Sequence, residues 1–421
     1  MIMIIIFLVL LFAGMPVAFA MAISGTLAVI RLGEVSPILI PQRLFMSLNS
    51  FPYLAVPFFI LAGGLMNSGG ITRRIIYFSK ALIGHMRGSL AQVNVVTNII
   101  MAGFSGSSTA DAVAVGTIMI PAMKEDGYPP EFSAGLTAAA ACIGPIIPPS
   151  LVMVVYGAIT GLSIGKMFLG GLIPGLLIGF ALMILVNFYA HKYNWPRGEK
   201  PTISKLVSAF MNAFLALIAP VIILGGIITG ITTATEAGVI AAVYAFIIGV
   251  FVYKEIHLRQ IPKILSDAAI NTAVPIIIIS CASIFGWILA RQNFASAIAN
   301  TLFGISTNPY IIYFLLICML LVIGLFIEGM AALIIFTPIF FPLAAQIGYD
   351  PIHFALIIII ALEIGTITPP VGLQLYVASS IAKVPISKVI VWPFAFVMII
   401  VLFITAYIPS LVTYLPSLFF K

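Results

Sequence analysis

Two motifs combine glycine, paired prolines and hydroxyl groups inside long apolar stretches: Gly144-Pro145-Ile146-Ile147-Pro148-Pro149-Ser150 and Gly365-Thr366-Ile367-Thr368-Pro369-Pro370-Val371. Proline lacks an N–H donor and disfavours helix at the residue before it, so both motifs should interrupt a helix. The carbonyls left without helical partners would be those of Gly144, Ile147, Gly365 and Thr368. In a bilayer such carbonyls need another partner, and carbonyl and hydroxyl oxygens can coordinate Na⁺ without a carboxylate. We therefore predict a cation site at each motif; for one motif alone, a simple proline kink is an equal alternative.

A hydroxyl-rich run, Gly103-Phe104-Ser105-Gly106-Ser107-Ser108-Thr109-Ala110-Asp111, has no reason to face lipid. Ser108 and Asp111 have the spacing of a capping box, which predicts the start of a half-helix that returns from a hairpin tip. The N-terminus of a helix carries partial positive charge and free N–H groups, so this tip would attract an anion. The alternative for the hydroxyl residues is local capping and packing. For Asp111 we favour capping over direct ion binding.

Four acidic residues interrupt apolar stretches: Asp111, Glu236, Glu328 and Glu363. Ionisable residues inside a membrane are functional candidates. Glu328 and Glu363 could lie close together, as a proton-coupled mechanism would require. Pairing with polar neighbours, or a place near the membrane interface, is the alternative. The threonines at 229–235 predict an exposed loop before Glu236.

The composition requires a membrane around these motifs. Of the 421 residues, 62% are hydrophobic and 7% are charged, against roughly 25% charged in a soluble domain, which excludes a soluble enzyme and a disordered chain. Only helices and closed barrels satisfy their backbone in lipid, and long uncharged runs favour helices over barrel strands. The runs without Asp, Glu, Lys or Arg are 1–30, 132–165, 206–235, 292–327 and 389–420. The predicted fold class is therefore an all-α polytopic membrane protein.

Other chemistries lack their sequence signatures. The three cysteines (Cys142, Cys281 and Cys318) are scattered in apolar stretches, so neither a disulfide framework nor a transition-metal site is expected. The basic residues behind the net charge of +7 lie in short loops, so we expect no nucleic acid partner. Nucleotide-binding, zinc-protease and nucleophile-elbow motifs do not occur, so we predict a non-enzyme without a cofactor that draws on an ion gradient. Residues 1–30 are interpreted as a first membrane helix, not as a cleaved signal.

Basic residues between the apolar runs predict the orientation. They gather at 73–87, 191–205, 254–263 and 383–388, and the positive-inside rule places all four groups in the cytoplasm. The path begins with helices at about 2–30 and 50–69 and a surface segment at 71–88. The other predicted segments are a hairpin at 90–123, spans at 131–161, 167–190, 206–230, 236–253 and 268–290, a surface segment at 291–308, a hairpin at 310–346, and spans at 352–382 and 388–415.

The chain contains an internal repeat. Residues 103–150 align without gaps on residues 324–371 at an offset of 221, with 14 identities in 48 positions that include matched glycines and prolines. The first hairpin enters from inside and the second from outside, so the copies are inverted, as in many secondary transporters with re-entrant hairpins and broken transmembrane helices. The predicted division is scaffold and arm helices at 1–88, transport core at 89–165, linker helices at 166–235, scaffold and arm helices at 236–308, transport core at 309–385 and a C-terminal helix at 386–421.

The motifs at 103–111, 144–150 and 365–371 together make the sequence resemble, over essentially its whole length, the large membrane subunit of tripartite ATP-independent periplasmic (TRAP) transporters. The resemblance implies a Na⁺-driven symporter subunit, in the bacterial inner membrane, that imports carboxylates such as C4-dicarboxylates or sialic acid. It implies two protein partners, a small four-helix membrane subunit and a periplasmic substrate-binding protein. It also implies an elevator-type transporter, whose hairpins and broken helices move against a scaffold.

The resemblance also assigns roles to residues of this chain. One Na⁺ would be held by Ser105, Ser108, Gly144, Ile147 and Pro149, and a second by Gly324, Gly329, Gly365, Thr368 and Val371. The substrate carboxylate would lie near Ser107, Thr109, Ser150 and Thr366. Arg31 would contact the binding protein, with an ordinary loop cation that anchors the first helix as the alternative.

Two other functions are the alternatives. A stand-alone Na⁺/dicarboxylate symporter of the related inverted-hairpin superfamily would take up free substrate without a binding protein. An intramembrane enzyme acting on lipid-borne substrates would need a pair such as Glu328 and Glu363 beside a histidine or serine, and no suitable histidine lies near either in the sequence. The sequence does not indicate which acid is carried, because no arginine lies at the predicted membrane centre.

Overall fold

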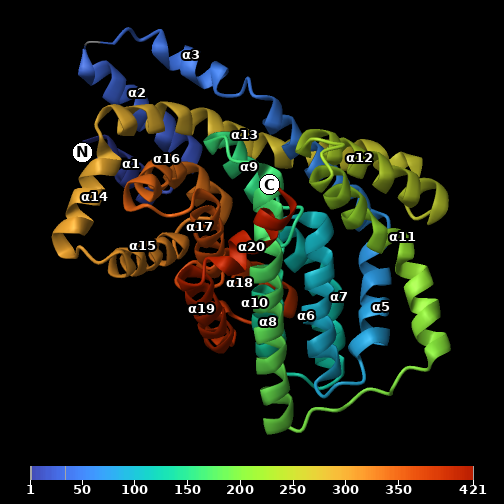
Figure 1. Cartoon of the computed structure of the whole chain (residues 1–421). Coiled ribbons are helices and arrows are strands. Elements are labelled where there is room, and N and C mark those ends of the chain that lie inside the picture. The colour runs from blue at the N-terminus through green and yellow to red at the C-terminus, as the bar shows by residue number, and fades with distance from the viewer. Residues whose placement is uncertain (1, 34, 421) are drawn as a thin grey trace.

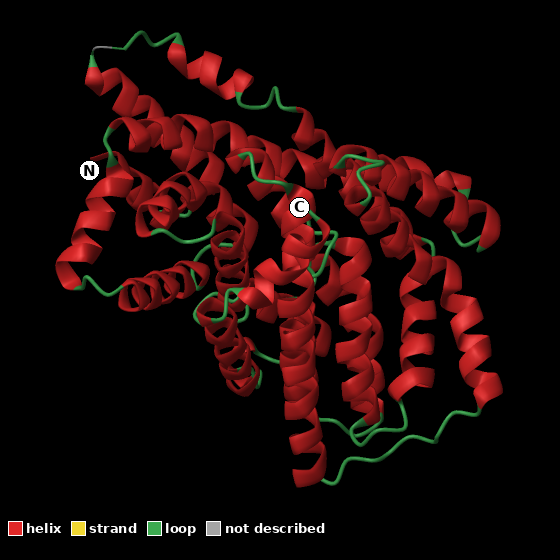
Figure 2. Cartoon of the chain, viewed as in Figure 1, coloured by secondary structure: helices red, strands yellow, loops and turns green. Residues whose placement is uncertain are grey.

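The computed structural model describes residues 2–33 and 35–420 and confirms the all-helical fold class. Within these residues every regular element is a helix (Figure 2). Six helices in this part of the chain are long and apolar enough to span a bilayer, or seven if the bent pair at the C-terminal end forms one span. These six are Phe51–Ser68, Ile164–Lys192, Ile203–Ile228, Ala234–Val252, Leu258–Arg291 and Gly329–Ile347.

The internal repeat is visible in the positions of the helices. The first copy comprises a hairpin of α6 (Ser89–Ser105) and α7 (Ser108–Glu125), followed by α8 (Pro130–Ala141) and α9 (Leu151–Thr160). The second comprises a hairpin of α15 (Pro309–Gly324) and α16 (Gly329–Ile347), followed by α17 (Pro351–Gly365) and α18 (Leu373–Ala382). At the offset of 221, α16 and α17 begin where α7 and α8 begin. Both breaks contain a cis Pro–Pro bond, Pro148–Pro149 in one and Pro369–Pro370 in the other.

The two broken helices run antiparallel. Ile390, which follows α18, donates its N–H to the carbonyl of Glu131 at the start of α8 (3.1 Å). At the other end, Gly170, which follows α9, packs against Ile352 at the start of α17. Each broken helix therefore ends beside the beginning of the other, and the two hairpins have their bases at opposite ends of the core. This geometry is the one that the inverted repeat predicted.

Long helices surround this core (Figure 1). α10 (Ile164–Lys192) packs on α6, α17 and α19 (Trp392–Tyr407), while α13 (Ile261–Arg291) packs on α2 (Val17–Leu32), α4 (Ala55–Ser68) and α16. α5 (Ile71–Ile83) lies against α11 (Ile203–Ile228), and α4 lies against α12 (Ala234–Ile247). The short elements are η1 (Phe51–Leu54), η2 (Ile248–Val252), η3 (Leu258–Gln260), α14 (Phe294–Ile305) and η4 (Ile386–Lys388).

The basic groups that were predicted to be cytoplasmic contact one another. An isolated backbone bridge between Arg87 and Arg197 joins the first group to the second. Arg74 of the first group forms an ion pair with Glu255 beside the third group (2.7 Å). Because loops on opposite sides of a bilayer cannot touch, these contacts support one shared side for the three groups.

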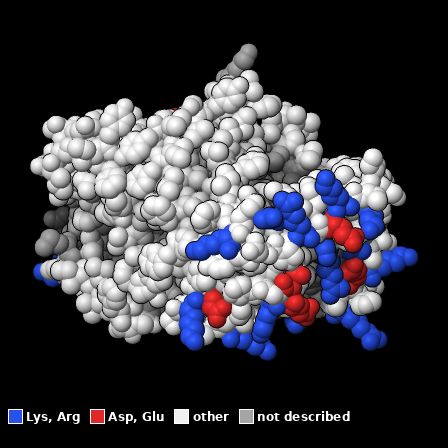
Figure 3. Space-filling model, turned by 90° about the horizontal axis from the view of Figure 1, so that it is seen from below, with Lys and Arg blue, Asp and Glu red and all other residues white. Residues whose placement is uncertain are grey.

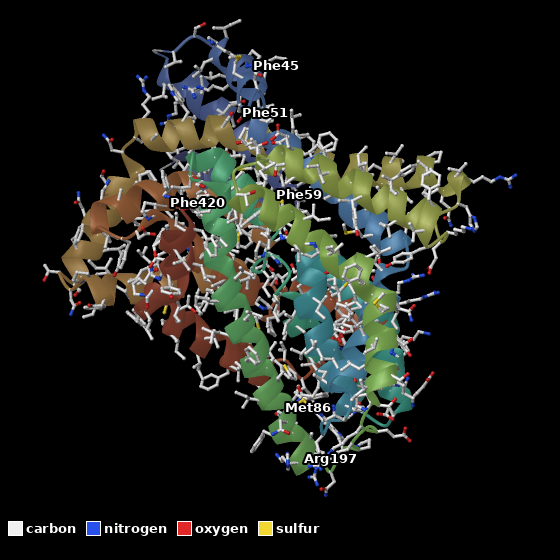
Figure 4. All side chains as sticks on the ribbon, turned by 45° about the vertical axis from the view of Figure 1, so that its right-hand side comes forward. Phe45, Phe51, Phe59, Met86, Arg197 and Phe420 are labelled. Carbon is white, nitrogen blue, oxygen red and sulfur yellow. The ribbon has the colours of Figure 1, made fainter. Side chains whose placement is uncertain are left out.

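The figures show the same asymmetry of charge. Met86 and Arg197 lie at one end of the molecule, and Phe45 and Phe51 lie at the opposite end (Figure 4). On the face seen from below, Lys, Arg, Asp and Glu crowd the right-hand part, whereas the left-hand part carries almost none (Figure 3). The charged part corresponds to the side that the positive-inside rule assigns to the cytoplasm.

The ion pair between Arg74 and Glu255 provides a first prediction. Replacing Glu255 with glutamine should lower the free energy of unfolding by less than about 1 kcal/mol, because the two side chains are 24% and 34% exposed. Arg74 keeps its stacking on the Tyr253 ring (3.7 Å to the centroid) in that variant. Thermal unfolding in detergent at low and high salt measures the effect. A loss of stability that is equally large in 1 M salt would contradict a screened surface pair.

Two predicted continuous helices are wrong. The helix expected at about 2–30 consists of α1 (Ile2–Phe12) and α2, because Gly14 takes a left-handed conformation (φ +86°) and Pro16 supplies no N–H. The helix expected at 388–415 consists of α19 and α20 (Ser410–Phe419), which are bent by 57° around Pro409. A further helix, α3 (Leu39–Met46), was not predicted.

Candidate functional site

The tip of the first hairpin contacts the break of its own repeat. Gly106 (φ +58°) lies so close to the break that a Cβ there would be 2.6 Å from the Pro149 carbonyl oxygen. Leu151 donates its N–H to the Gly106 carbonyl (3.4 Å). A Cβ on Gly144 would meet the Asp111 carboxylate and the Ser107 backbone. We call this contact, between residues 103–111 and 142–150, the first site.

The first site gathers the predicted ligands of one sodium ion. Ser105 ends α6, and Ser108 begins α7. The break at 142–150 carries the other three, and among the described residues the carbonyls of Gly144, Ile147 and Pro149 accept no hydrogen bond. Buried carbonyl oxygens that accept no hydrogen bond can coordinate a small hard cation, and the hydroxyl groups of the hairpin tip can supply further oxygen ligands. The structure therefore brings these five residues to one tip–break contact.

The second site is the equivalent contact, at the offset of 221, between residues 324–332 and 363–371. The backbones of Gly324 and Gly365 touch, and a Cβ on either would overlap the other. Gly329 faces the Glu363 carboxylate and the Thr366 methyl group. The prediction that the Gly365 carbonyl lacks a partner is wrong, because it accepts the Thr368 N–H in a tight turn (2.9 Å).

Two other predicted ligands of the second sodium ion are Thr368 and Val371. Thr368 donates its hydroxyl to the Ile364 carbonyl (2.8 Å), and Val371 is half-exposed. A carbonyl oxygen has two lone pairs, so one turn hydrogen bond at Gly365 leaves the other lone pair free. Thr368 likewise keeps its hydroxyl lone pairs and its carbonyl. The donor set is compatible with a cation here, with more of its oxygens already engaged than at the first site.

The two sites are neighbours because the breaks start side by side. Cys142 and Glu363 are equivalent residues at the offset of 221, and the Cys142 thiol donates to the Glu363 carbonyl (3.4 Å). Thr366 donates its hydroxyl to the same carbonyl (2.7 Å) and lies 3.7 Å from the Cys142 sulfur. The crossing point of the broken helices therefore contains both copies of one repeat position.

The capping of the returning half-helices differs from the prediction. Ser107, not Ser108, is the N-cap of α7 and accepts the Ala110 N–H (3.4 Å). The proposed capping role of Asp111 is wrong: its side chain is fully buried, and neither carboxylate oxygen has a hydrogen-bond partner among the described residues. Glu328 occupies the position equivalent to Ser107 and caps α16 by accepting the Ala331 N–H (2.9 Å).

The remaining acidic residue behaves as its sequence context predicted. Glu236 forms a capping box with Thr233 at the start of α12 and is exposed. Thr232 and Thr233 lie in the loop between α11 and α12, and Thr229 is the C-cap of α11. The expected loop does not include Thr235, which lies in the first turn of α12, is buried and donates its hydroxyl to the Phe51 carbonyl (3.3 Å). Glu236 therefore plays a local structural role at the end of a span.

A cavity of about 870 Å³ opens beside the first hairpin tip. Its walls come from α2, α4 and α13 on one side and from α6, α7 and the start of α16 on the other. The walls are mostly apolar, and the polar side chains among them are Asn67, Ser105, Ser107, Thr109, Asp111, Asn271 and Glu328. No lysine or arginine lines this cavity among the described residues. An anion bound here would rely on hydroxyl and amide donors and on the N-terminus of α7.

The structure separates the predicted substrate residues into two pairs. Ser107 and Thr109 line the cavity. Ser150 donates its hydroxyl to the Pro145 carbonyl (2.6 Å) and caps α9, and the Thr366 hydroxyl is bonded to Glu363. The Ser150 and Thr366 side chains are buried and do not line the cavity. Arg31 lies far along the chain from these residues, exposed in the last turn of α2.

Three polar residues near the site were missed by the sequence analysis. Asn67 and Asn271 line the cavity from α4 and α13. Gln374, at the start of α18, is buried and reaches the first hairpin tip. The available signal was that each interrupts an apolar helix, as the acidic residues do.

Comparisons with known proteins assign the family. Residues 4–411 match the family described as "Tripartite ATP-independent periplasmic transporter, DctM component". The chain is 39% identical to the sialic acid TRAP transporter large permease protein SiaM of Vibrio cholerae, over 97% of this chain and 96% of that protein. It is 37% identical to the C4-dicarboxylate TRAP transporter large permease protein DctM of Pseudomonas aeruginosa, over 94% of each chain.

A solved structure supports the fold. The crystal structure of the YdaH transporter of Alcanivorax borkumensis, which has an unusual topology, superimposes with a TM-score of 0.62 at 11% sequence identity. The match covers 84% of this chain and 85% of that one. At this identity the likeness concerns the fold alone. By the family match and the close relatives, the chain belongs to the DctM component family of tripartite ATP-independent periplasmic transporters, as a multi-pass permease subunit of the bacterial inner membrane and not an enzyme.

Proposed function

We propose that this chain is the permease subunit of a Na⁺-coupled symporter that imports a small carboxylate. The observation that carries the proposal is the contact of a hydroxyl-rich hairpin tip with a broken helix whose carbonyls at Gly144, Ile147 and Pro149 accept no hydrogen bond within the described chain. One sodium ion binds there with Ser105 and Ser108. A second binds at the equivalent contact with Gly324, Gly329, Gly365, Thr368 and Val371.

The carboxylate binds in the cavity at the N-terminus of α7. Ser107 and Thr109 line the cavity at this end, and the free N–H groups of the first turn favour negative charge. The N-terminus of α16 is less suitable because Glu328 already caps it with a carboxylate. The names of the two relatives, for sialic acid and for C4-dicarboxylates, support a carboxylate as the cargo.

Asp111 gives a physical reason for coupling the two ligands. Its buried carboxylate lies in the first turn of α7, next to Gly144 and on the cavity wall. A second carboxylate at the same helix end would be repelled by an ionised Asp111, and repulsion is strong where water is excluded. A sodium ion at the first site offsets that repulsion. Substrate binding should therefore strengthen as the sodium concentration rises.

The place of the cavity supports an elevator mechanism. One wall belongs to the hairpins of the predicted transport core, and the other belongs to α2, α4 and α13 of the predicted scaffold. Movement of the core as a body would carry a ligand bound at the hairpin tip past the scaffold wall. The periplasmic binding protein contacts the exposed Arg31 and delivers the substrate to this cavity. The small four-helix membrane subunit completes the scaffold.

Reconstitution tests the proposal. Liposomes contain this chain with its small membrane subunit and receive a candidate acid with its binding protein, under an inward Na⁺ gradient or an equal K⁺ gradient. We expect uptake that requires Na⁺, the small subunit and the binding protein. Equal uptake with K⁺ would overturn the sodium coupling. Uptake of free substrate by this chain alone would support the stand-alone symporter instead.

A further inference from the structure

Gln374 links the second broken helix to the tip of the first hairpin. It lies at the start of α18, and its own N–H donates to the Thr366 carbonyl across the break (3.0 Å). Its side-chain Nε2 donates to the Ser108 hydroxyl (2.7 Å) and to the Thr109 hydroxyl (3.1 Å). The side chain is 1% exposed. One amide therefore ties the two repeats together at Ser108, a proposed sodium ligand, and at Thr109, a proposed substrate residue.

The link exists in one direction only. The residue equivalent to Gln374 in the first repeat is Met153, which cannot donate a hydrogen bond. The residues equivalent to Ser108 and Thr109 in the second tip are Gly329 and Met330, which have no hydroxyl. The donor and its acceptors are thus both present between the second break and the first tip, and both absent between the first break and the second tip. Such matched differences indicate a specific interaction and not a general polar lining.

A donor of this kind fixes hydroxyl groups that would otherwise rotate. A hydroxyl has one O–H donor and two lone pairs, and the amide Nε2 can only donate. With one lone pair engaged by Gln374, Ser108 keeps a second lone pair for a cation at the first site.

We propose that Gln374 is a positioning residue that makes sodium binding at the first site depend on the conformation of the second break. It acts through Ser108 and Thr109 and does not itself ligate the ion. Any movement of α18 relative to the first hairpin tip disturbs these hydroxyls, so occupation of the first site favours one relative position of the two repeats. This role rests on the proposed Na⁺ coupling. It adds to that proposal the residue that connects the first repeat with the second.

Replacement of Gln374 by leucine tests the role. Leucine removes both donors at similar volume and leaves the buried Ser108 hydroxyl and the half-buried Thr109 hydroxyl without this partner. Gln92 provides a matched control, because it is also a buried glutamine whose Nε2 makes a hydrogen bond, to the Met183 carbonyl (3.0 Å), and whose Oε1 has no partner among the described residues. Gln92 lies in α6, near the base of the hairpin and away from its tip.

The measurement is the thermal unfolding of the purified full-length chain, titrated with NaCl at constant total NaCl plus KCl. We expect half-maximal stabilisation of Gln374→Leu to need about tenfold more Na⁺ than the wild type, as the loss of two hydrogen bonds of ordinary net strength implies. Gln92→Leu should lower the unfolding temperature in KCl but keep the wild-type Na⁺ response.

The outcomes separate the two proposals. No Na⁺ response in the wild type would overturn the sodium site itself. A normal wild-type response with the same half-maximal Na⁺ concentration in both variants would overturn the positioning role of Gln374 alone. An equal loss of response in both variants would assign the effect to general destabilisation and would also overturn it.

Discussion

The variant Gly365→Ala is expected to lose most of its folded, sodium-responsive population. The backbones of Gly324 and Gly365 touch where the second hairpin tip meets its break, and a Cβ at either position overlaps the other main chain. Main chain cannot move aside as a flexible side chain can, so the free energy of unfolding should fall by at least about 3 kcal/mol, the upper end for overpacking. Thermal unfolding in detergent, in KCl and in NaCl, measures both the stability and the sodium response.

Gly225→Ala is the control for that substitution. Gly225 lies inside α11, and a Cβ there would meet nothing within 4 Å. Alanine at this position should leave stability unchanged or raise it by up to about 1 kcal/mol, because alanine is the better helix former. If Gly365→Ala unfolded like Gly225→Ala, the close contact of the two main chains would not exist in the protein.

The double variant Pro148→Ala/Pro149→Ala should lose nearly all sodium-dependent uptake. Alanine restores two N–H donors in the break between α8 and α9, so the helix can continue and its carbonyls find internal partners. The contact of Gly106 with Pro149 would then be lost together with the free carbonyls of the first site. We expect uptake to fall about a hundredfold, the factor that corresponds to the roughly 3 kcal/mol by which one proline disfavours a helix.

Pro416→Ala is the matched control for the prolines. Pro416 lies within α20, a helix that continues around it, at a distance along the chain from both sites. Uptake by this variant should equal that of the wild type in the same reconstituted system. Wild-type uptake by the Pro148/Pro149 variant would show that the break in the first repeat is dispensable for sodium coupling.

Much of the fold could be predicted from glycine and proline, because these residues act on the backbone locally. The offset of 221 predicted both hairpins and both breaks, and α16 and α17 begin where the repeat requires. Gly14 and Pro16 also divide the predicted first helix, and Pro409 separates α19 from α20, although neither break belongs to the repeat. Hydropathy alone does not reveal such breaks, because the apolar run continues through them.

The site was harder to predict because its contacts join distant segments. Ser108 and Thr109 were identified from local composition, yet their partner Gln374 lies 266 and 265 residues away. Asp111 had the spacing of a capping residue, but the helix begins one residue earlier than that spacing assumes, at the Ser107 cap, and its carboxylate is buried instead. A single sequence contains no direct signal for either fact, since both depend on how the two repeats pack.

The meeting of Cys142 with the Glu363 carbonyl has an evolutionary consequence. A dimer of two identical copies would place the same side chain on both sides of its symmetry axis, so every substitution there would occur twice. Fusion of the copies into one polypeptide removes that restriction. One repeat can then have a thiol, as at Cys142, where the other has a carboxylate, as at Glu363. Each hairpin tip can likewise acquire its own chemistry while the shared architecture is preserved.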